Sequence, residues 1–259
     1  MRRVKTDKSI ISDLPDKIEN NQICNLSKEQ AALYKSITYD LMQEVENAEG
    51  ISRRGIILKL LTILKQVCNH PLQYLKNGDA LKPEQSGKMM LLLQLLETIY
   101  ENGEKVMIFS QYKEMGSLLR TVIHEHFGKK ALQLHGGNTR KERDEMVRSF
   151  QNNPVSDTFI LSLKAGGTGL NLTAGNHVIH YDLWWNPAVE AQATDRAFRI
   201  GQQKNVMVHR MITKGTLEEK IDDMLRSKKQ LANLTVTNGE KWIGELSDRD
   251  LKQLVTLGD

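Results

Sequence analysis

Residues 182–202 read DLWWNPAVEAQATDRAFRIGQ and hold the densest chemistry of this 259-residue chain. The stretch is typical of a strand end that leads into a helix, because Asn186 is a favourable N-cap and Pro187 suits the first helical position. Gly201 is a natural stop for such a helix. The pattern therefore predicts a strand–helix unit whose helix spans residues 187–200.

Three side chains of this helix are suited to binding phosphate. Gln192, Arg196 and Arg199 fall at i, i+4 and i+7, so we expect one amide and two guanidiniums on the same helix face. Arginine donates hydrogen bonds to phosphate oxygens in a fixed fork geometry. The alternative is a solvated face on which Asp195 and Arg199 form an ordinary i, i+4 ion pair. Spacing alone leaves both interpretations open.

On either side of this stretch, short apolar runs alternate with helical patterns, which indicates βαβ units and a parallel sheet. The fold class we expect is therefore α/β, with a parallel sheet flanked by helices. The expected strands span residues 106–110, 131–134, 158–163, 177–182 and 206–211. The expected helices of this part span residues 115–127, 139–151, 187–200 and 217–231.

Polar residues follow the first two of these strands, where ligands of open α/β sheets bind. Ser110 and Gln111 come at the end of the first strand. His135 and Gly136 follow the second, and the glycine allows another backbone to approach closely. These residues predict a ligand-binding edge at the carboxyl ends of the strands.

The third strand is followed by KAGGTGLN, residues 164–171. Glycines such as Gly167 and Gly169 let consecutive N–H groups converge on an anion, and Lys164 and Thr168 add side-chain donors. The loop is suited to holding phosphate. Taken alone, the same glycines fit an ordinary turn equally well.

The composition is that of a soluble globular protein with a mild positive charge. Hydrophobic residues make up 39% and charged residues 26%, and the net charge of +4 permits nucleic-acid binding without arguing strongly for it. Cys24 and Cys68 lack CxxC spacing and plausible co-ligands, so neither disulfides nor a metal site is indicated. The longest apolar run, residues 89–93, is too short to span a bilayer, and no signal segment precedes it. We expect a cytoplasmic, nucleoid-associated protein with no membrane partner.

Residues 1–85 carry almost no strand signal and are expected to be helical. Ser27 and Gln30 form a capping-box pattern in front of an amphipathic helix. A second helix is expected over residues 53–68. The polar stretch that follows, residues 77–86, is the best candidate for a boundary.

Lys88 stands in a Ser-Gly-Lys sequence that invites comparison with a phosphate-binding P-loop. No glycine precedes Gly87 at the GxxxxGK spacing, and Met89 stands where the magnesium-binding Ser or Thr would be. We therefore reject a P-loop and expect a helix that begins at Ser86. A further capped helix is expected behind Ser247, near the end of the chain.

Several stretches resemble the signatures of one family. QATDRAFRIGQ, residues 192–202, resembles motif VI of the Swi/Snf-type ATPases of helicase superfamily two, and WWNP, residues 184–187, resembles their motif Va. Other stretches are similar to family segments, so the resemblance covers nearly the whole chain. These are DLPDK at 13–17, LKQVCNHP at 64–71, SQ at 110–111, LHG at 134–136 and KAGGTGLN at 164–171.

The resemblance implies the second RecA-like motor lobe of a prokaryotic-like member of this family. Residues 86–231 would form the lobe, residues 1–85 a helical protrusion and inter-lobe linker, and residues 232–259 a C-terminal brace. The chain would then start in mid-protein, and an absent first RecA-like lobe would be its partner. ATP and its Mg²⁺ would be bound mainly by that first lobe.

The resemblance also implies roles for individual residues. Arg196 and Arg199 would be arginine fingers, whose loss typically costs about 10³ to 10⁵ in turnover. If the strand continues through Trp184 and Trp185, the two rings alternate sides, and Trp185 would face the DNA. Contacts to the nucleotide are implied for Gln192, Gly167 and Gly169. Contacts to the DNA backbone are implied for Ser110, Gln111, His135, Gly136, Lys164, Thr168, Asn171 and Trp185, so DNA binding would be salt-sensitive and nearly sequence-independent.

The activity implied is ATP-dependent translocation along double-stranded DNA, with a DNA-bound protein as a further candidate substrate. The chain has no Walker A motif, so we expect the isolated chain neither to hydrolyse ATP nor to bind it tightly. Two alternatives are a lobe of a DEAD-box-type RNA helicase and a non-catalytic module that docks nucleic acid or protein. Asp195 and the RIGQ ending depart from the DEAD-box pattern, and the two arginines count against docking alone.

Overall fold

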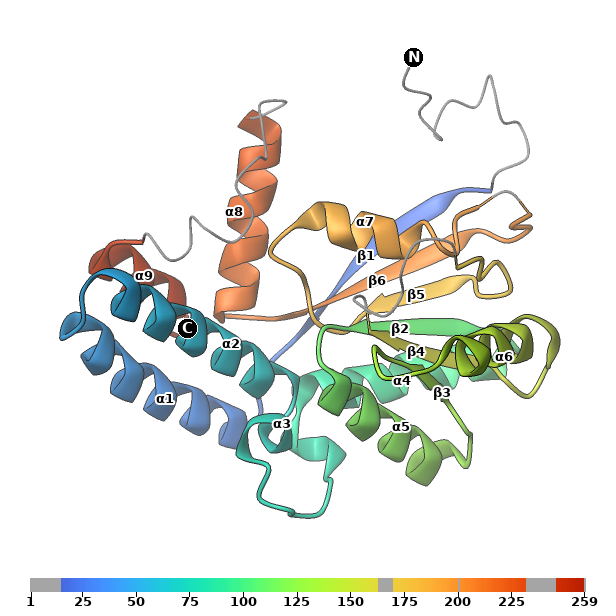
Figure 1. The fold of residues 1–259 in the computed structure, drawn as a ribbon, viewed down its shortest axis with the longest axis horizontal. Coiled ribbons are helices and arrows are strands. Elements are labelled where there is room, and N and C mark those ends of the chain that lie inside the picture. The colour runs from blue at the N-terminus through green and yellow to red at the C-terminus, as the bar shows by residue number, and fades with distance from the viewer. Residues whose placement is uncertain (1–14, 163–169, 200, 232–245, 259) are drawn as a thin grey trace. The chain divides into compact units, whose positions relative to one another are not determined.

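The computed structural model describes residues 15–162, 170–199, 201–231 and 246–258, and for residues 228–231 it describes the backbone alone. The chain forms two compact units, each assembled from three separate stretches (Figure 1). The sheet unit comprises Met1–Asn21, Leu95–Tyr181 and Ala188–Arg210, and the helical unit comprises Gln22–Gln94, Asp182–Pro187 and Met211–Asp259. The predicted domain boundaries at residues 85 and 231 stay predictions, because compact units and functional domains need not coincide.

The described residues form a six-stranded sheet in the order β1-β6-β5-β2-β4-β3. The pairings β2 with β4, β2 with β5, β3 with β4 and β5 with β6 are all parallel. At the edge, Val206 N donates to Asp16 O and Lys214 N donates to Cys24 O, so β1 and β6 advance in the same direction. The strands are β1 Lys17–Cys24, β2 Val106–Ser110, β3 Leu132–Leu134, β4 Thr158–Ser162, β5 His177–His180 and β6 Val206–Thr213.

The five predicted strands are confirmed, with ends that differ by at most two residues. The strand β1 is not among them, and it contradicts the expectation that residues 1–85 are helical apart from loops. Its sequence, KIENNQIC, is largely exposed and lies at the edge of the sheet, with β6 as its neighbour. An exposed edge strand needs no apolar face, so its sequence lacks the alternation that would have revealed it.

Each predicted helix has a counterpart in the structure, but α7 ends earlier than predicted, and the short helix α3 and the turn η1 were not predicted. Their order along the chain is shown in Figure 1. They are α1 Lys28–Glu46, α2 Gly50–Asn69, α3 Pro71–Leu75, the 3₁₀ turn η1 Pro83–Gln85, α4 Gly87–Glu101, α5 Lys113–Phe127, α6 Arg140–Asn152, α7 Pro187–Thr194, α8 Leu217–Leu231 and α9 Asp248–Val255.

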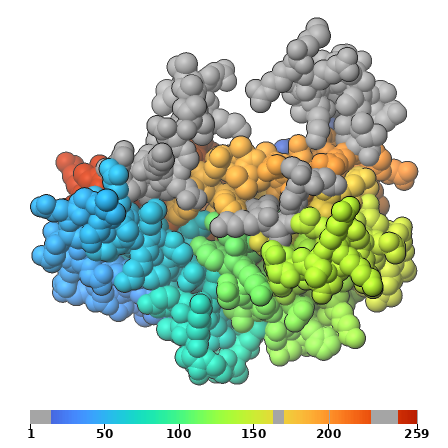
Figure 2. Space-filling model, viewed as in Figure 1, coloured from blue at the N-terminus to red at the C-terminus, as the bar shows by residue number. Residues whose placement is uncertain are grey.

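Helices cover both faces of the sheet within the sheet unit. Met107 and Phe109 of β2 pack with Phe150 of α6 in one buried cluster. Alternation along the strand directs Val106 and Ile108 to the opposite face, and both are fully buried. The helix α5 contacts β2, β3 and β4. Most of α6 is polar and lies at the surface, as the space-filling view shows (Figure 2).

The helical unit has its own core, built by α1, α2, α8 and α9. The apolar stripe predicted for α1 is confirmed, and its Tyr34 is fully buried. The Tyr34 hydroxyl accepts a hydrogen bond of 3.2 Å from Leu217 N at the start of α8. Leu251 and Leu254 of α9 join the same cluster. Along the described parts of the chain, every helix is too short or too polar to serve as a membrane span.

Two predicted helix boundaries are confirmed by their caps. Ser27 and Gln30 exchange two hydrogen bonds of 3.0 Å and form the capping box at the start of α1. The helix α2 ends at Asn69, and the following His70 is buried. Its Nδ1 accepts from Leu72 N at 3.2 Å, and burial lowers its pKa. His70 therefore serves as the cap between α2 and α3.

Candidate functional site

The structure brings two of the predicted site residues to one edge of the sheet. Ser110 and His135 both line a cavity of about 10 Å³ at the carboxyl ends of β2, β3 and β4. That volume is about what a single water molecule needs. The polar edge predicted from the sequence therefore exists at these two strands.

The four predicted residues at this edge differ in how accessible they are. The side chain of Ser110 is buried, and its Oγ accepts from Tyr112 N at 3.2 Å. Gln111 and His135 are half-buried, and Gly136 is exposed. The hydroxyl of Ser110 thus shapes the turn, while Gln111, His135 and Gly136 remain accessible to a ligand.

Local hydrogen bonds order the loop that follows β3. His135 N donates to Asn138 Oδ1 at 2.8 Å, and His135 Nδ1 accepts from Gly137 N at 3.1 Å. Thr139 then caps α6 in a capping box with Glu142. The loop is therefore preorganised by its own residues. The next predicted group, Lys164, Gly167, Thr168 and Gly169, lies outside the described residues, and Asn171 beyond it is exposed.

The helix α7 begins at Pro187 as predicted but ends at Thr194, six residues before the predicted end. Beyond it the chain tightens, because Arg196 N donates to Ala193 O and Ala197 N donates to Thr194 O. The carbonyl oxygen of Arg196 accepts a hydrogen bond of 3.1 Å from Leu172 N. The bonds from Arg196 N and Ala197 N each reach back three residues, as in a 3₁₀ helix, instead of the four residues of an α-helix.

The prediction that Gln192, Arg196 and Arg199 share one helix face is wrong, because the helix stops between them. Gln192 is exposed on α7, Arg196 is buried at 5% exposure and Arg199 is half-buried. The Arg199 Nε donates to the main-chain oxygen of Asp195 at 3.1 Å.

Arg196 is also influenced by a third guanidinium, that of Arg143. Burial lowers the pKa of Arg196, and the positive charges of Arg199 and of Arg143 on α6 lower it further. We call Arg143, Arg196 and Arg199 the arginine cluster. Three like charges around a partly desolvated position favour an anion among them. Arg143 was not predicted, because α6 and α7 are distant in sequence and nothing in its own segment marks it.

Buried polar contacts hold α7 on the sheet. Glu190 accepts from the Nε of Arg210 at 3.0 Å, and both residues are buried. At the end of the helix, Thr194 Oγ1 and His180 Nε2 lie 3.0 Å apart. The helix α7, which leads to Arg196 and Arg199, is therefore anchored to β6 through Glu190 and to β5 through Thr194.

Lowering the pH from 7 to 5 is expected to destabilise the chain, partly through His180. Burial lowers the pKa of His180 to about 3, with help from the charges of Arg210 and Lys17. Burial likewise lowers the pKa of His209 to about 4. In the unfolded chain both imidazoles bind a proton near pH 6.5, so below that pH the unfolded state binds more protons and stability falls. Each histidine costs about 1.4 kcal/mol per pH unit, or about 2 kcal/mol at pH 5.

Urea unfolding at pH 7 and pH 5 measures this effect. The substitution His180→Gln keeps a polar side chain beside Thr194 but cannot bind the proton. It should reduce the pH-dependent loss by about 2 kcal/mol, whatever it does to stability at pH 7. An unchanged pH dependence in this variant would show that His180 does not titrate as described.

Trp185 belongs to the helical unit and has a different setting from the one predicted. The strand β5 ends at His180, so the expected alternation of Trp184 and Trp185 along a continuing strand does not occur. Both side chains are half-buried, and Trp185 packs against the helical core. The ammonium of Lys65 lies 4.4 Å from the centroid of the Trp185 ring. The predicted DNA contact of Trp185 stays a prediction.

The rejection of a P-loop at Lys88 agrees with the geometry. A Cβ on Gly87 would lie 1.8 Å from the carbonyl oxygen of Asn25, so close packing alone accounts for this glycine. The side chain of Lys88 is fully buried, and its Nζ forms an ion pair of 2.6 Å with Glu218. An amino group in this position does not face a nucleotide.

Known proteins are similar to this chain in both sequence and fold. Residues 87–201 match a family model described as the helicase conserved C-terminal domain, and residues 1–73 match one described as the SNF2-related domain. The solved C-terminal domain of the SWI2/SNF2 ATPase of Sulfolobus solfataricus is 41% identical. It covers 94% of this chain and 100% of its own length, with a TM-score of 0.82. This chain belongs to the SWI2/SNF2 family.

Longer SWI2/SNF2 proteins match this chain over part of their length. The Sulfolobus solfataricus SWI2/SNF2 ATPase core in complex with dsDNA is 44% identical over 100% of this chain and 54% of its own, with a TM-score of 0.85. The putative ATP-dependent helicase/translocase YwqA of Bacillus subtilis is 48% identical over 99% of this chain and 28% of its own length. The chain thus spans about a quarter of that relative. The parallel sheet confirms the expected RecA-like fold of the SWI2/SNF2 C-terminal lobe.

Proposed function

We propose that this chain is the second motor lobe of a SWI2/SNF2 enzyme that uses ATP to move along double-stranded DNA. The observation that carries the proposal is the match of the whole chain to a SWI2/SNF2 ATPase core whose structure is a complex with dsDNA. That core is about twice as long as the matched part. In our proposal the remainder corresponds to the first lobe, which binds ATP and Mg²⁺.

The arginine cluster is suited to ATP that is held mainly by another lobe. Its guanidiniums carry positive charge, and Arg196 is desolvated beside Arg199 and Arg143. Guanidiniums donate hydrogen bonds to phosphate oxygens in a fixed geometry, which is why the cluster fits the group. Bound ATP with Mg²⁺ supplies the phosphoryl group whose transfer drives the motor. In the proposal Arg199, which is half-buried, donates to phosphate oxygens, while the buried Arg196 orients Arg199 and adds charge.

The DNA contacts in the proposal go to backbone phosphates and not to bases. Gln111, His135 and Gly136 are the accessible residues at the described strand ends. Lys164, Thr168 and Asn171 are proposed from the sequence to extend this surface, and Trp185 to border it. Binding would then weaken steeply with salt and vary little with DNA sequence. A DNA-bound protein is the proposed cargo of the complete enzyme.

The isolated chain is expected to release no phosphate from ATP, with or without duplex DNA. The phosphate-binding lysine and the metal-binding carboxylate of such motors belong to the other lobe. A protein that carries both lobes should hydrolyse ATP, and duplex DNA should stimulate it more than RNA does. A phosphate-release assay on both proteins measures this. Turnover by the isolated chain that is abolished by Arg199→Ala would contradict the division of roles between lobes.

A further inference from the structure

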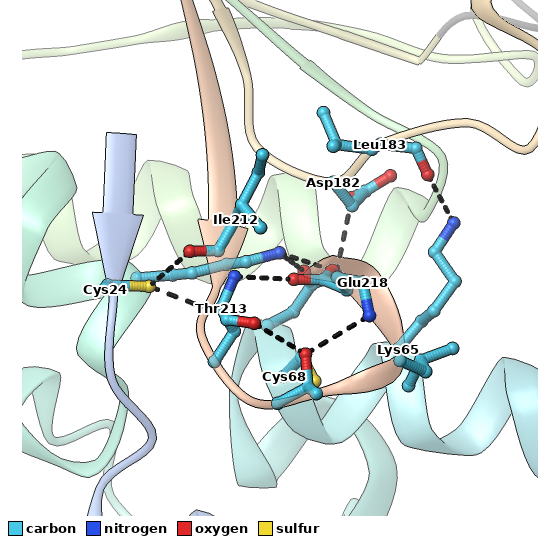
Figure 3. Close-up of polar contacts among 12 residues, drawn as sticks. Cys24, Lys65, Cys68, Asp182, Leu183, Ile212, Thr213 and Glu218 are labelled. Atoms are coloured by element: carbon cyan, nitrogen blue, oxygen red, sulfur yellow. Dashed lines mark hydrogen bonds and ion pairs between the residues drawn. The ribbon is translucent and has the colours of Figure 1, made fainter. Parts of the chain in front are cut away.

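Two side chains of α2 reach the segment that carries the WWNP sequence. Lys65 and Asn69 lie one helical turn apart on α2. The Lys65 Nζ donates to the carbonyl oxygen of Leu183, and Figure 3 shows its ammonium directed at that oxygen. Asn69 Nδ2 donates to Asp182 Oδ2 at 3.3 Å. Together with the Lys65–Trp185 contact, these bonds bind the segment of residues 182–185 to α2 within the helical unit.

We call the contacts of Lys65 and Asn69 with residues 182–185 the clasp. The side chains that form its polar contacts are buried. Lys65 is 2% exposed, Asn69 is fully buried and Asp182 is 1% exposed. Burying a charged ammonium costs free energy unless its partners replace the lost water. Neighbouring positions on the same helix, such as Leu61 and Leu64, are filled by apolar side chains. An apolar residue of similar size, such as Met, would therefore pack α2 at least as well as Lys65. The charge at position 65 is thus explained by its contacts with residues 183 and 185 and not by the packing of the helix.

The clasp is itself anchored to the rest of the helical unit. Asn69 Oδ1 accepts from Lys88 Nζ at 3.2 Å, and Lys88 pairs with Glu218 at the start of α8. Glu218 Oε2 accepts from Thr213 N at 3.1 Å, at the end of β6. A continuous set of buried polar contacts therefore runs from the segment of residues 182–185 to three other elements. Such a network fixes one geometry, because each member loses its partner if the segment moves.

We propose that Lys65 is a positioning residue that couples DNA binding to ATP turnover, by holding the Leu183–Trp185 backbone and the Trp185 ring on α2. The inference rests on the proposed function of the chain. The clasped segment continues directly into α7, which leads to Arg196 and Arg199. Held by Lys65, the segment transmits a displacement of Trp185 along the chain to α7. Without Lys65, DNA still binds but no longer accelerates hydrolysis.

The test uses a protein that carries both motor lobes and compares Lys65→Met with Lys59→Met. Lys59 lies on the same helix but is half-exposed and pairs weakly with Glu44 at 3.7 Å. In the Lys65→Met variant, turnover at saturating duplex DNA should fall about tenfold, while turnover without DNA stays at the wild-type rate. The Lys59→Met variant should match the wild type in both measurements. Hydrogen exchange of residues 182–187 should rise in Lys65→Met, with that of β2 unchanged.

Three outcomes of this experiment would overturn the proposed role of Lys65. Full stimulation by DNA in Lys65→Met would overturn the inference. An equal fall in turnover with and without DNA, together with faster exchange throughout the protein, would reduce Lys65 to a structural residue and also overturn it. If the wild-type two-lobe protein is not stimulated by duplex DNA, the proposed function itself fails, and the inference fails with it.

Discussion

Replacing Arg199 with alanine is expected to lower DNA-stimulated ATP turnover by about 10³ to 10⁵ in a protein that carries both motor lobes. The loss follows from removing positive charge where the transferred phosphoryl group develops its transition-state charge. Arg199 is the better candidate of the two predicted arginine fingers, because it is half-buried whereas Arg196 is 5% exposed. The substitution also leaves the core of the sheet unit in place.

Two further variants make the Arg199 measurement specific. Arg199→Lys keeps the charge but loses the planar fork, so it should recover little of the turnover. Arg120→Ala removes an exposed arginine from α5 and should leave turnover unchanged. Affinity for duplex DNA, measured at constant salt, should be the same in all three. Turnover of Arg199→Ala within tenfold of the wild type would rule out a finger role for this residue.

Replacing Lys88 with methionine is expected to destabilise the chain by about 3 to 5 kcal/mol. The side chains of Lys88 and Glu218 are 0% and 1% exposed, and their ion pair is 2.6 Å long. Burial is the largest single influence and lowers the pKa of Lys88, but the Glu218 carboxylate, together with Cys68 and Cys24, raises the pKa overall. Lys88 is therefore charged in the folded chain, and its removal leaves the buried Glu218 without its ion-pair partner.

A double-mutant cycle measured by urea unfolding tests this pair. Lys88→Met combined with Glu218→Leu should be much more stable than the two separate losses predict, because no buried charge is left over. The matched control is the exposed pair of Lys59 and Glu44, whose side chains are 55% and 51% exposed. Its cycle should give less than about 1 kcal/mol. Additive losses at Lys88 and Glu218 would mean that the buried pair does not act as a unit.

Local signals were strong enough to predict most of the fold. The capping box of Ser27 and Gln30, the apolar stripe through Tyr34 and the apolar strand runs depend on neighbours within a few residues. Because these signals depend only on residues close in sequence, the predicted strands and helices nearly coincide with those of the structure. Ser110 and His135 were predicted to meet at one edge because parallel strands place their carboxyl ends together.

Features decided by distant contacts could not be predicted. Beyond the early end of α7, Leu172 N donates a hydrogen bond to the carbonyl oxygen of Arg196, a distant contact that the pattern of residues 187–200 does not reveal. The contacts of Lys65 and Asn69 with Leu183 and Asp182 join residues 118 and 113 positions apart. In the sequence, Lys65 is one of four cations in α2, and nothing distinguishes it from the exposed Lys59. Its burial against Trp185 is visible only once the chain is folded.

The central claim is that Arg199 serves a nucleotide held by the other motor lobe. The most direct test is an experimental structure of the two-lobe protein with duplex DNA and a non-hydrolysable ATP analogue. We predict that the Arg199 guanidinium lies within about 3 Å of an oxygen of the terminal phosphate. A closed, DNA-bound structure in which Arg196 and Arg199 both remain turned into their own unit, with no contact to the nucleotide, would contradict the claim.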